Sequence, residues 1–135
     1  MKKLLCAAIV TVPMCLASTG YVYAESDAGV AVVLRTLDKV TARTLDLTVG
    51  IDETVAYGTL DITVRKCLKR PPEETPETST FLEINERQQD EEPLPLFMGW
   101  MFASSPALNA LEHPVYDVWV IDCKMSDAEQ SKGKE

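Results

Sequence analysis

The stretch Val40–Cys67, which reads "VTARTLDLTVGIDETVAYGTLDITVRKC", decides the fold class of this chain. Apolar side chains occupy every second position in two runs within it, namely Leu45, Leu47 and Val49 and then Leu60, Ile62 and Val64. A period of two indicates a strand that has one buried and one exposed face. The residues "GIDE" predict a turn between the runs, and Gly58 predicts a bend or bulge, because glycine inside a strand pattern often marks one.

Cys67, at the end of this stretch, conflicts with the alternation. Strict alternation places Cys67 on the polar face with Thr63 and Arg65, whereas a cysteine that forms a disulfide more naturally points inward. We therefore expect one of two arrangements. Either this face is covered near the end of the strand, or the strand leaves its register before Cys67.

Similar patterns predict further strands at Val30–Arg35, Thr80–Ile84, Leu96–Phe102 and Val115–Cys123. The last of these has apolar residues on both faces, which predicts a strand that is central or covered on both faces. Before it, Ser105 and Pro106 predict the start of one short helix that runs to about Glu112 and ends before Pro114. About six or seven strands and one short helix predict a mainly β fold with a single domain, a small antiparallel β-barrel or sandwich.

The first residues have the layout of a bacterial export signal. Lys2 and Lys3 give a positive start, and the apolar segment after them is too short to span a bilayer. Val22 and Ala24 suit a signal peptidase that cleaves directly after Ala24. We therefore expect a signal peptide at residues 1–24, a β-domain at 25–125 and a disordered polar tail at 126–135. The protein would then be periplasmic and would keep no membrane span after cleavage.

Charge and cysteine content narrow the expected partners and the expected cross-links. The formal net charge of −8 becomes −10 when the two lysines of the signal are removed. Such a charge repels nucleic acid and anionic lipid, so neither is an expected partner. Cys67 and Cys123 remain after cleavage, and an even pair in an exported protein is expected to form one disulfide.

Few residues could carry catalysis or bind a metal. His113, the only histidine, could act as a base for Ser104 or Ser105, but the chain has no G-x-S-x-G motif. A helix cap at Ser105 and a helix end at His113 explain both residues without catalysis. One histidine and two cross-linked cysteines cannot supply a zinc site, and the acidic loops lack the spacing of a calcium loop. We therefore expect no enzyme activity, no metal and no cofactor.

Two segments are candidates for binding a partner. Basic residues lie beside the proline-rich stretch "RPPEETPE", namely Arg65, Lys66, Lys69 and Arg70. They could form a patch for an acidic partner, or they could neutralise the glutamates that follow. The other segment holds Trp100, Leu108 and Leu111, which either close the core or present a surface to a partner.

The motifs "KRPPEETPE" and "GWMFASSPALNALEHPVYDVWV" resemble those of a family of small exported proteins from Gram-negative bacteria, known as domain of unknown function 2155. The resemblance covers Val33–Lys124, and the cysteines in the family's motifs match Cys67 and Cys123. It implies no activity, cofactor or catalytic residue that could be transferred to this chain.

Together these features predict a non-enzymatic module of the periplasm or cell envelope. Its partner would be an unknown envelope protein or a cell-wall component. Two alternatives stay open at this point. One is a small hydrolase that uses Ser105 or Ser104 with His113, and the other is a barrel that holds a lipid or a sugar. The sequence makes no prediction about the oligomeric state.

Overall fold

The computed structural model describes residues 26–127, and its regular elements are all β-strands. In chain order they are β1 (Asp27–Ala28), β2 (Ala31–Asp38), β3 (Arg43–Gly50), β4 (Thr54–Tyr57), β5 (Leu60–Lys69), β6 (Thr78–Glu86), β7 (Leu94–Phe102) and β8 (Tyr116–Lys124). The mainly β fold that the alternating pattern predicts is confirmed. The short strand β1 was not predicted, because two residues carry no readable period.

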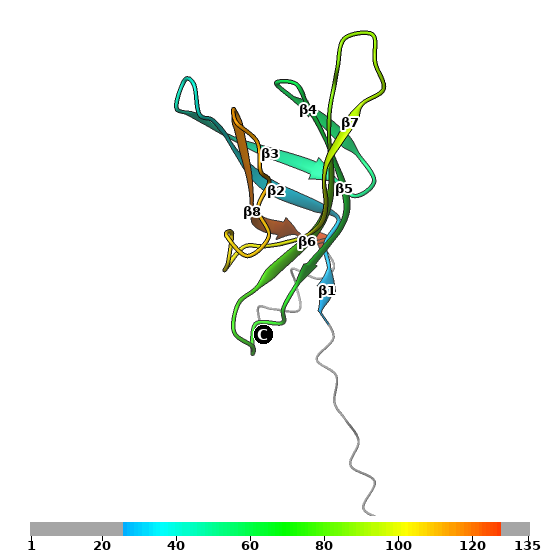
Figure 1. The fold of residues 1–135 in the computed structure, drawn as a ribbon. Coiled ribbons are helices and arrows are strands. Elements are labelled where there is room, and N and C mark those ends of the chain that lie inside the picture. The colour runs from blue at the N-terminus through cyan, green and yellow to red at the C-terminus, as the bar shows by residue number, and fades with distance from the viewer. Residues whose placement is uncertain (1–25, 128–135) are drawn as a thin grey trace, which may run out of the picture.

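The strands form two antiparallel sheets that pack against each other (Figure 1). One sheet has three strands in the order β3–β2–β8. The other has five strands, in the order β1–β5–β6–β7 with β4 also paired to β5. Because the edge strands of the two sheets are not paired with each other, the fold is not a closed barrel.

Each cysteine follows a one-residue β-bulge, which resolves the conflict at Cys67. In β5 the pairing with β6 shifts between Val64 and Lys66, so Arg65 is the extra residue. In β8 the pairing with β2 shifts in the same way, and Ile121 is the extra residue. An extra residue reverses the alternation beyond it, so both cysteines point inward and are buried. They form a disulfide between the two sheets, with the Cα atoms 5.8 Å apart.

The chain passes from one sheet to the other directly beside this disulfide. After β1, the Gly29 N–H donates to the Cys67 carbonyl in one sheet, and the Val30 N–H donates to the Lys124 carbonyl in the other, each at 2.8 Å. A Cβ atom at Gly29 would lie 2.9 Å from the Cβ atom of Cys123, so a larger residue would push the chain away. This end of the molecule is therefore held by backbone bonds as well as by the disulfide.

The space between the sheets is filled by aliphatic side chains. The fully buried members of this core, each with no exposed area, are Val32, Leu34, Leu60, Ile62, Val64, Leu82 and Ile84. Complete burial of one such side chain stabilises a fold by about 1.5–3 kcal/mol. These residues form one packed cluster between the sheets.

The predicted helix at residues 105–112 is wrong. This segment forms turns, in which the Leu108 N–H donates to the Ser105 carbonyl at 3.0 Å. A segment of this length between two prolines is too short to stay helical by propensity alone. Leu111 is instead drawn into the core, where only 4% of its surface is exposed.

Of the two positions predicted for the last strand, the central one is wrong, because β8 lies at the edge of its sheet and β2 is central. The second apolar face of β8 carries Trp119, which is half-buried on the outer surface. The predicted signal peptide, residues 1–24, lies outside the described residues, as does the predicted tail from residue 128 onward. Within residues 26–127, no helix has the length and apolar character that a membrane crossing requires.

Candidate functional site

An open pocket of about 440 Å³ lies at the end of the molecule that carries the disulfide. One wall is the loop between β5 and β6, residues 70–77, which we call the proline loop. It contributes Pro71, Pro72 and Pro76 to the lining. The opposite wall comes from Ala103 and Ser104 after β7 and from Ile121 in β8. The pocket therefore combines segments that are far apart in the sequence.

Ion pairing and the disulfide hold the two walls together. Lys69 at the end of β5 and Asp122 in β8 form an ion pair across the pocket, with 2.7 Å between Nζ and Oδ1. Lys69 stands two residues after Cys67, and Asp122 directly precedes Cys123, so the covalent link lies immediately behind the ion pair. The ion pair and the disulfide therefore link β5 to β8 at the edge of the pocket.

Glu77 fixes the second half of the proline loop. Its carboxylate accepts hydrogen bonds from the Ser104 hydroxyl, from the Ser104 N–H at 3.2 Å and from the Thr78 N–H at 3.0 Å. Partial burial raises the pKa of Glu77, but these hydrogen bonds and the charge of Arg70 outweigh it, so the net shift is downward. The loop is thus anchored by a carboxylate that stays ionised.

The predicted basic patch is divided between two surfaces. Lys69 and Arg70 line the pocket. Arg65, the bulge residue, points to the outer face of the five-stranded sheet, where it contacts Glu83 at 3.1 Å and Asp52 at 3.2 Å. These two contacts raise the pKa of Arg65, the bonds to Glu83 more than those to Asp52. The surface carboxylates therefore neutralise part of the predicted patch.

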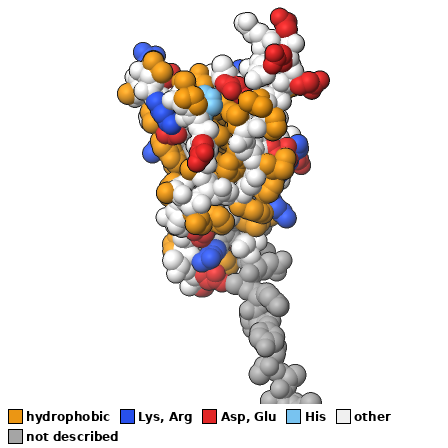
Figure 2. All heavy atoms as spheres, in the orientation of Figure 1, with side chains coloured by type: hydrophobic (Ala, Val, Ile, Leu, Met, Phe, Trp, Pro, Cys, Tyr) orange, Lys and Arg blue, Asp and Glu red, His pale blue; other side chains and the backbone are white. Residues whose placement is uncertain are grey.

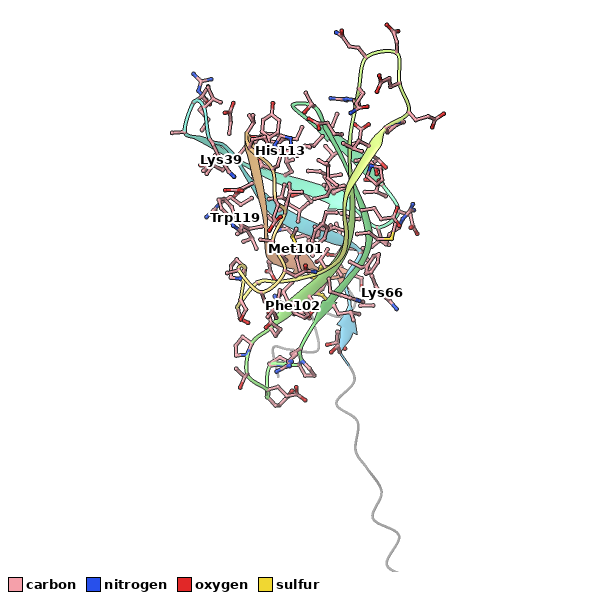
Figure 3. The ribbon with its side chains drawn as sticks, viewed as in Figure 1. Lys39, Lys66, Met101, Phe102, His113 and Trp119 are labelled. Carbon is pink, nitrogen blue, oxygen red and sulfur yellow. A yellow bond between two sulfur atoms is a disulfide. The ribbon has the colours of Figure 1, made fainter. Side chains whose placement is uncertain are left out.

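Lys66 also lies on the outer face, away from the pocket. It is exposed, stands opposite Phe81 in the β5–β6 pairing, and forms no ion pair with the described residues. Figure 3 shows its side chain projecting from the side of the molecule that is remote from Trp119. The four predicted cations thus do not act as one surface.

The aromatic and leucine candidates are also divided. Trp100 lies half-buried on the outer face of β7, in edge-to-face contact with Phe81 at 5.6 Å between ring centroids. Its carbonyl accepts a hydrogen bond from the Asn109 side chain at 2.8 Å. Leu111 is a core residue with 4% exposure, whereas Leu108 is 72% exposed. Only Leu108 and part of Trp100 are thus available to a partner.

The serine and histidine of the hydrolase alternative lie at opposite ends of β6. Ser104 is bound to Glu77, directly before β6, and His113 contacts Glu86, the last residue of β6. A nine-residue strand spans about 30 Å. Figure 3 agrees, with His113 near the top and Phe102, close in sequence to Ser104, far below it. General base catalysis needs the two groups within hydrogen-bond reach, so these residues do not form a catalytic pair.

His113 instead supports the loop before β8. Its Nδ1 accepts the N–H groups of Val115 at 3.1 Å and Tyr116 at 3.0 Å, so the ring proton lies on Nε2 and is donated to Glu86 at 3.2 Å. The hydrogen bonds from His113 and Thr59 lower the pKa of Glu86. The ring also stacks on Tyr116, with 5.2 Å between centroids. His113 is thus a structural residue in the loop that precedes β8. It does not stand at the end of a helix, as the sequence predicted.

The space-filling view shows the surroundings of His113. Figure 2 shows the histidine ring at the upper end of the visible face and acidic side chains on the loop that projects above it. No group of three or more possible metal ligands occurs among residues 26–127.

The sequence did not predict Ile121 as a residue that lines the pocket. One signal in the sequence could have indicated the bulge that contains it. A valine precedes each cysteine by three residues, at Val64 and Val120, and an odd spacing between two inward-facing residues implies one extra residue in the strand.

Comparisons with known proteins agree with the resemblance in the motifs. Residues 31–123 match the family described as "Uncharacterized protein conserved in bacteria (DUF2155)". The chain is also similar to "Uncharacterized protein RP359" of Rickettsia prowazekii (strain Madrid E), with 33% identity over 87 residues, which is 64% of this chain and 56% of that protein. The chain thus spans just over half the length of this relative. No solved structure matches the chain. Because the family match covers most of the domain, this chain belongs to the bacterial family of uncharacterized proteins DUF2155.

Proposed function

We propose that this domain is a non-enzymatic module of the cell envelope that binds a protein or cell-wall partner through the pocket beside the disulfide. One observation carries the proposal, namely that an open pocket of about 440 Å³, whose lining includes three prolines and Ile121, is already formed in the free domain. Pockets that bind small ligands or side chains typically measure about 300–1,000 Å³ and are mostly apolar. An apolar side chain of a partner therefore fits the space between the prolines and Ile121.

The rigidity of the pocket supports a binding role. Proline fixes the backbone angle φ, and three of the lining residues are prolines. Glu77, Lys69 and the disulfide hold the remaining lining in place. A site that is ordered before binding loses less entropy when the partner arrives, and this raises affinity.

Two further lining charges have no ion-pair partner among the described residues, although the charge of Arg70 also acts on Glu77. Lys69 is paired with Asp122, and Glu77 is saturated by hydrogen bonds. Arg70 and Glu74 also line the pocket and form no ion pair with the described residues. A few polar groups around an apolar pocket are what fix the orientation of a ligand.

The expected location of the protein is compatible with this role. The export signal predicted at residues 1–24 directs the chain to the periplasm, and disulfides form and persist there. The cross-link joins the two strands that contribute Lys69 and Asp122 to the pocket. A reducing compartment would leave the pocket without the bond that joins its two walls.

Crosslinking in intact cells tests the proposal, with a matched pair of variants. Arg70→Glu changes an exposed cation at the pocket, and Lys66→Glu changes an exposed cation on the outer face. We expect a specific crosslinked partner in the wild type, a loss of at least about tenfold in Arg70→Glu, which corresponds to about 1.4 kcal/mol, and no loss in Lys66→Glu.

A second pair tests the apolar part of the pocket. Ile121→Asp places a charge inside it, and Val40→Asp places the same charge at a remote residue that is 78% exposed. The proposal predicts that only Ile121→Asp reduces crosslinking at unchanged thermal stability. Equal capture by all four variants would remove the pocket as the contact.

A further inference from the structure

The edge of β3 presents unused backbone hydrogen-bonding groups at three alternate residues, whereas Glu53 occupies the N–H and C=O groups of Gly50 at the end of the strand. β3 pairs with β2 over eight residues without a register shift. The Ile51 N–H donates to the Val30 carbonyl, which fixes the alternation of the β2–β3 ladder. By that alternation the N–H and C=O groups of Thr44, Asp46 and Thr48 point away from β2. No described residue hydrogen-bonds to these backbone groups.

The other long edge strands are protected, whereas β3 is not. β7 has Pro95 and a register shift near its start, and Asn109 occupies the Trp100 carbonyl. On β8, the Tyr116 N–H is taken by His113 and the Cys123 N–H by the Asp122 side chain. Proline, bulges and side-chain caps are the usual means of blocking an edge. β3 has such a cap only at its last residue, where Glu53 accepts the Gly50 N–H, and it carries the charges of Arg43 and Asp46.

The inner face of β3 is also incompletely covered at this edge. Val49 is buried with 2% exposure, but Leu45, on the same face, is 53% exposed. Leu45 stands opposite the fully buried Thr36 of β2, so it belongs to the core side of the sheet. The apolar surface of Leu45 therefore lies where the next strand of the sheet would cover it.

We infer that the β3 edge pairs with the β3 edge of a second copy of this chain, in antiparallel orientation. The free groups select one register, in which Thr44 faces Thr48 of the second copy and Asp46 faces Asp46. It is the register that pairs all three residues of each copy. The two three-stranded sheets then become one continuous six-stranded sheet related by a twofold axis.

Side chains in this register are complementary to themselves. Leu45 stands opposite Leu47 of the second copy, and the reverse pair forms as well. The exposed Leu45 of each copy is therefore covered. Asp46 meets its own copy, but each Asp46 is already neutralised by a two-pronged contact from Arg35 at 2.8 and 2.9 Å.

The pairing is expected to be weak, because a single pair of strands buries less than the about 1,200 Å² of a stable interface. Net negative charge on both copies opposes it further. We therefore expect a dissociation constant between about 1 µM and 1 mM. Sedimentation velocity of the purified protein over this range should show a monomer that becomes a dimer as concentration rises.

Two variants at exposed apolar residues locate the interface. Leu45→Lys places a charge on the β3 edge, whereas Met98→Lys places it on the β7 strand at a residue that is 71% exposed. We expect Leu45→Lys to remain a monomer at about 1 mM and Met98→Lys to dimerise as the wild type does. Loss of the dimer in Met98→Lys but not in Leu45→Lys would overturn the inference, as would a wild type that stays monomeric.

Hydrogen exchange gives an independent readout of the register. The amides of Thr44, Asp46 and Thr48 should exchange rapidly in dilute protein and at least about tenfold more slowly in concentrated protein. The amide of Val49, which points toward β2, should be protected at both concentrations. A dimer that leaves the three edge amides unprotected would use another surface and would contradict the proposal. This readout does not depend on the pocket or on its partner.

Discussion

The Cys67–Cys123 disulfide should contribute a large share of the stability of this domain. It joins residues 56 positions apart and connects the two sheets. In the chain-entropy model, a loop of this length stabilises the folded state by about 4 kcal/mol. A domain of this size has a total free energy of unfolding of about 5–15 kcal/mol. Loss of the cross-link is therefore expected to leave a domain that is close to unfolding at physiological temperature.

Urea denaturation of three forms measures this contribution. The forms are the oxidised wild type, the reduced wild type and the double variant Cys67→Ala/Cys123→Ala. With a slope of about 1.5 kcal/mol per molar urea, a loss of 4 kcal/mol lowers the midpoint by about 3 M. The reduced wild type isolates the cross-link, because it keeps both sulfur atoms in the core. The double variant should be less stable still, since it also removes two buried sulfur atoms.

Two results would refute the expected contribution of the disulfide and its sulfur atoms. A reduced wild type whose midpoint lies within about 0.5 M of the oxidised form would show that the disulfide adds little, and that the backbone bonds of Gly29 and Val30 suffice to hold this end together. A double variant that matches the oxidised protein would show in addition that the two sulfur atoms are dispensable to the core.

Two further predictions concern the loop before β8 and the end of β6. Leu111→Ala should lower the free energy of unfolding by about 2–5 kcal/mol, whereas Leu108→Ala should change it by less than about 0.5 kcal/mol in the same urea titration. Equal effects would mean that Leu111 is not a core residue. The hydrogen bonds from His113 and Thr59 lower the pKa of Glu86 below the ordinary value for a glutamate. The ionised carboxylate therefore adds stability above that ordinary value, and this stability is lost as the pH falls through the folded-state pKa. Glu86→Gln should therefore lose less stability than the wild type between pH 7 and pH 3, and an identical loss would contradict the assignment.

The candidate site could be predicted from the sequence only in part. The proline loop and its position beside Cys67 are readable, because prolines exclude regular structure and the cysteine count implies a cross-link. The pocket itself could not be read, since Ile121 and Ser104 reach it only through the packing of the two sheets. Adjacent basic residues in the sequence suggested one patch. The bulge at Arg65 instead places Arg65 and Lys66 on the outer face, away from the pocket that Lys69 and Arg70 line.

The sequence by itself determined the strands, because alternation of apolar and polar residues is a local property that follows from backbone geometry. It also determined that Cys67 and Cys123 would be joined, from their number and from the expected compartment. Only the tertiary structure decided the fate of the segment before β8. There the burial of Leu111 outweighs a weak local preference for a helix, and the side chain of Asn109 is fixed by the Trp100 carbonyl.

The two bulges were likewise decided by the tertiary structure. A cross-link between two sheets requires both cysteines to face the core, and regular alternation would turn each of them outward. One extra residue in each strand, Arg65 and Ile121, reverses the alternation at the point where the disulfide needs it. The physical reason is that local pattern sets which residues form strands, whereas the geometry between sheets sets where those strands must break their register.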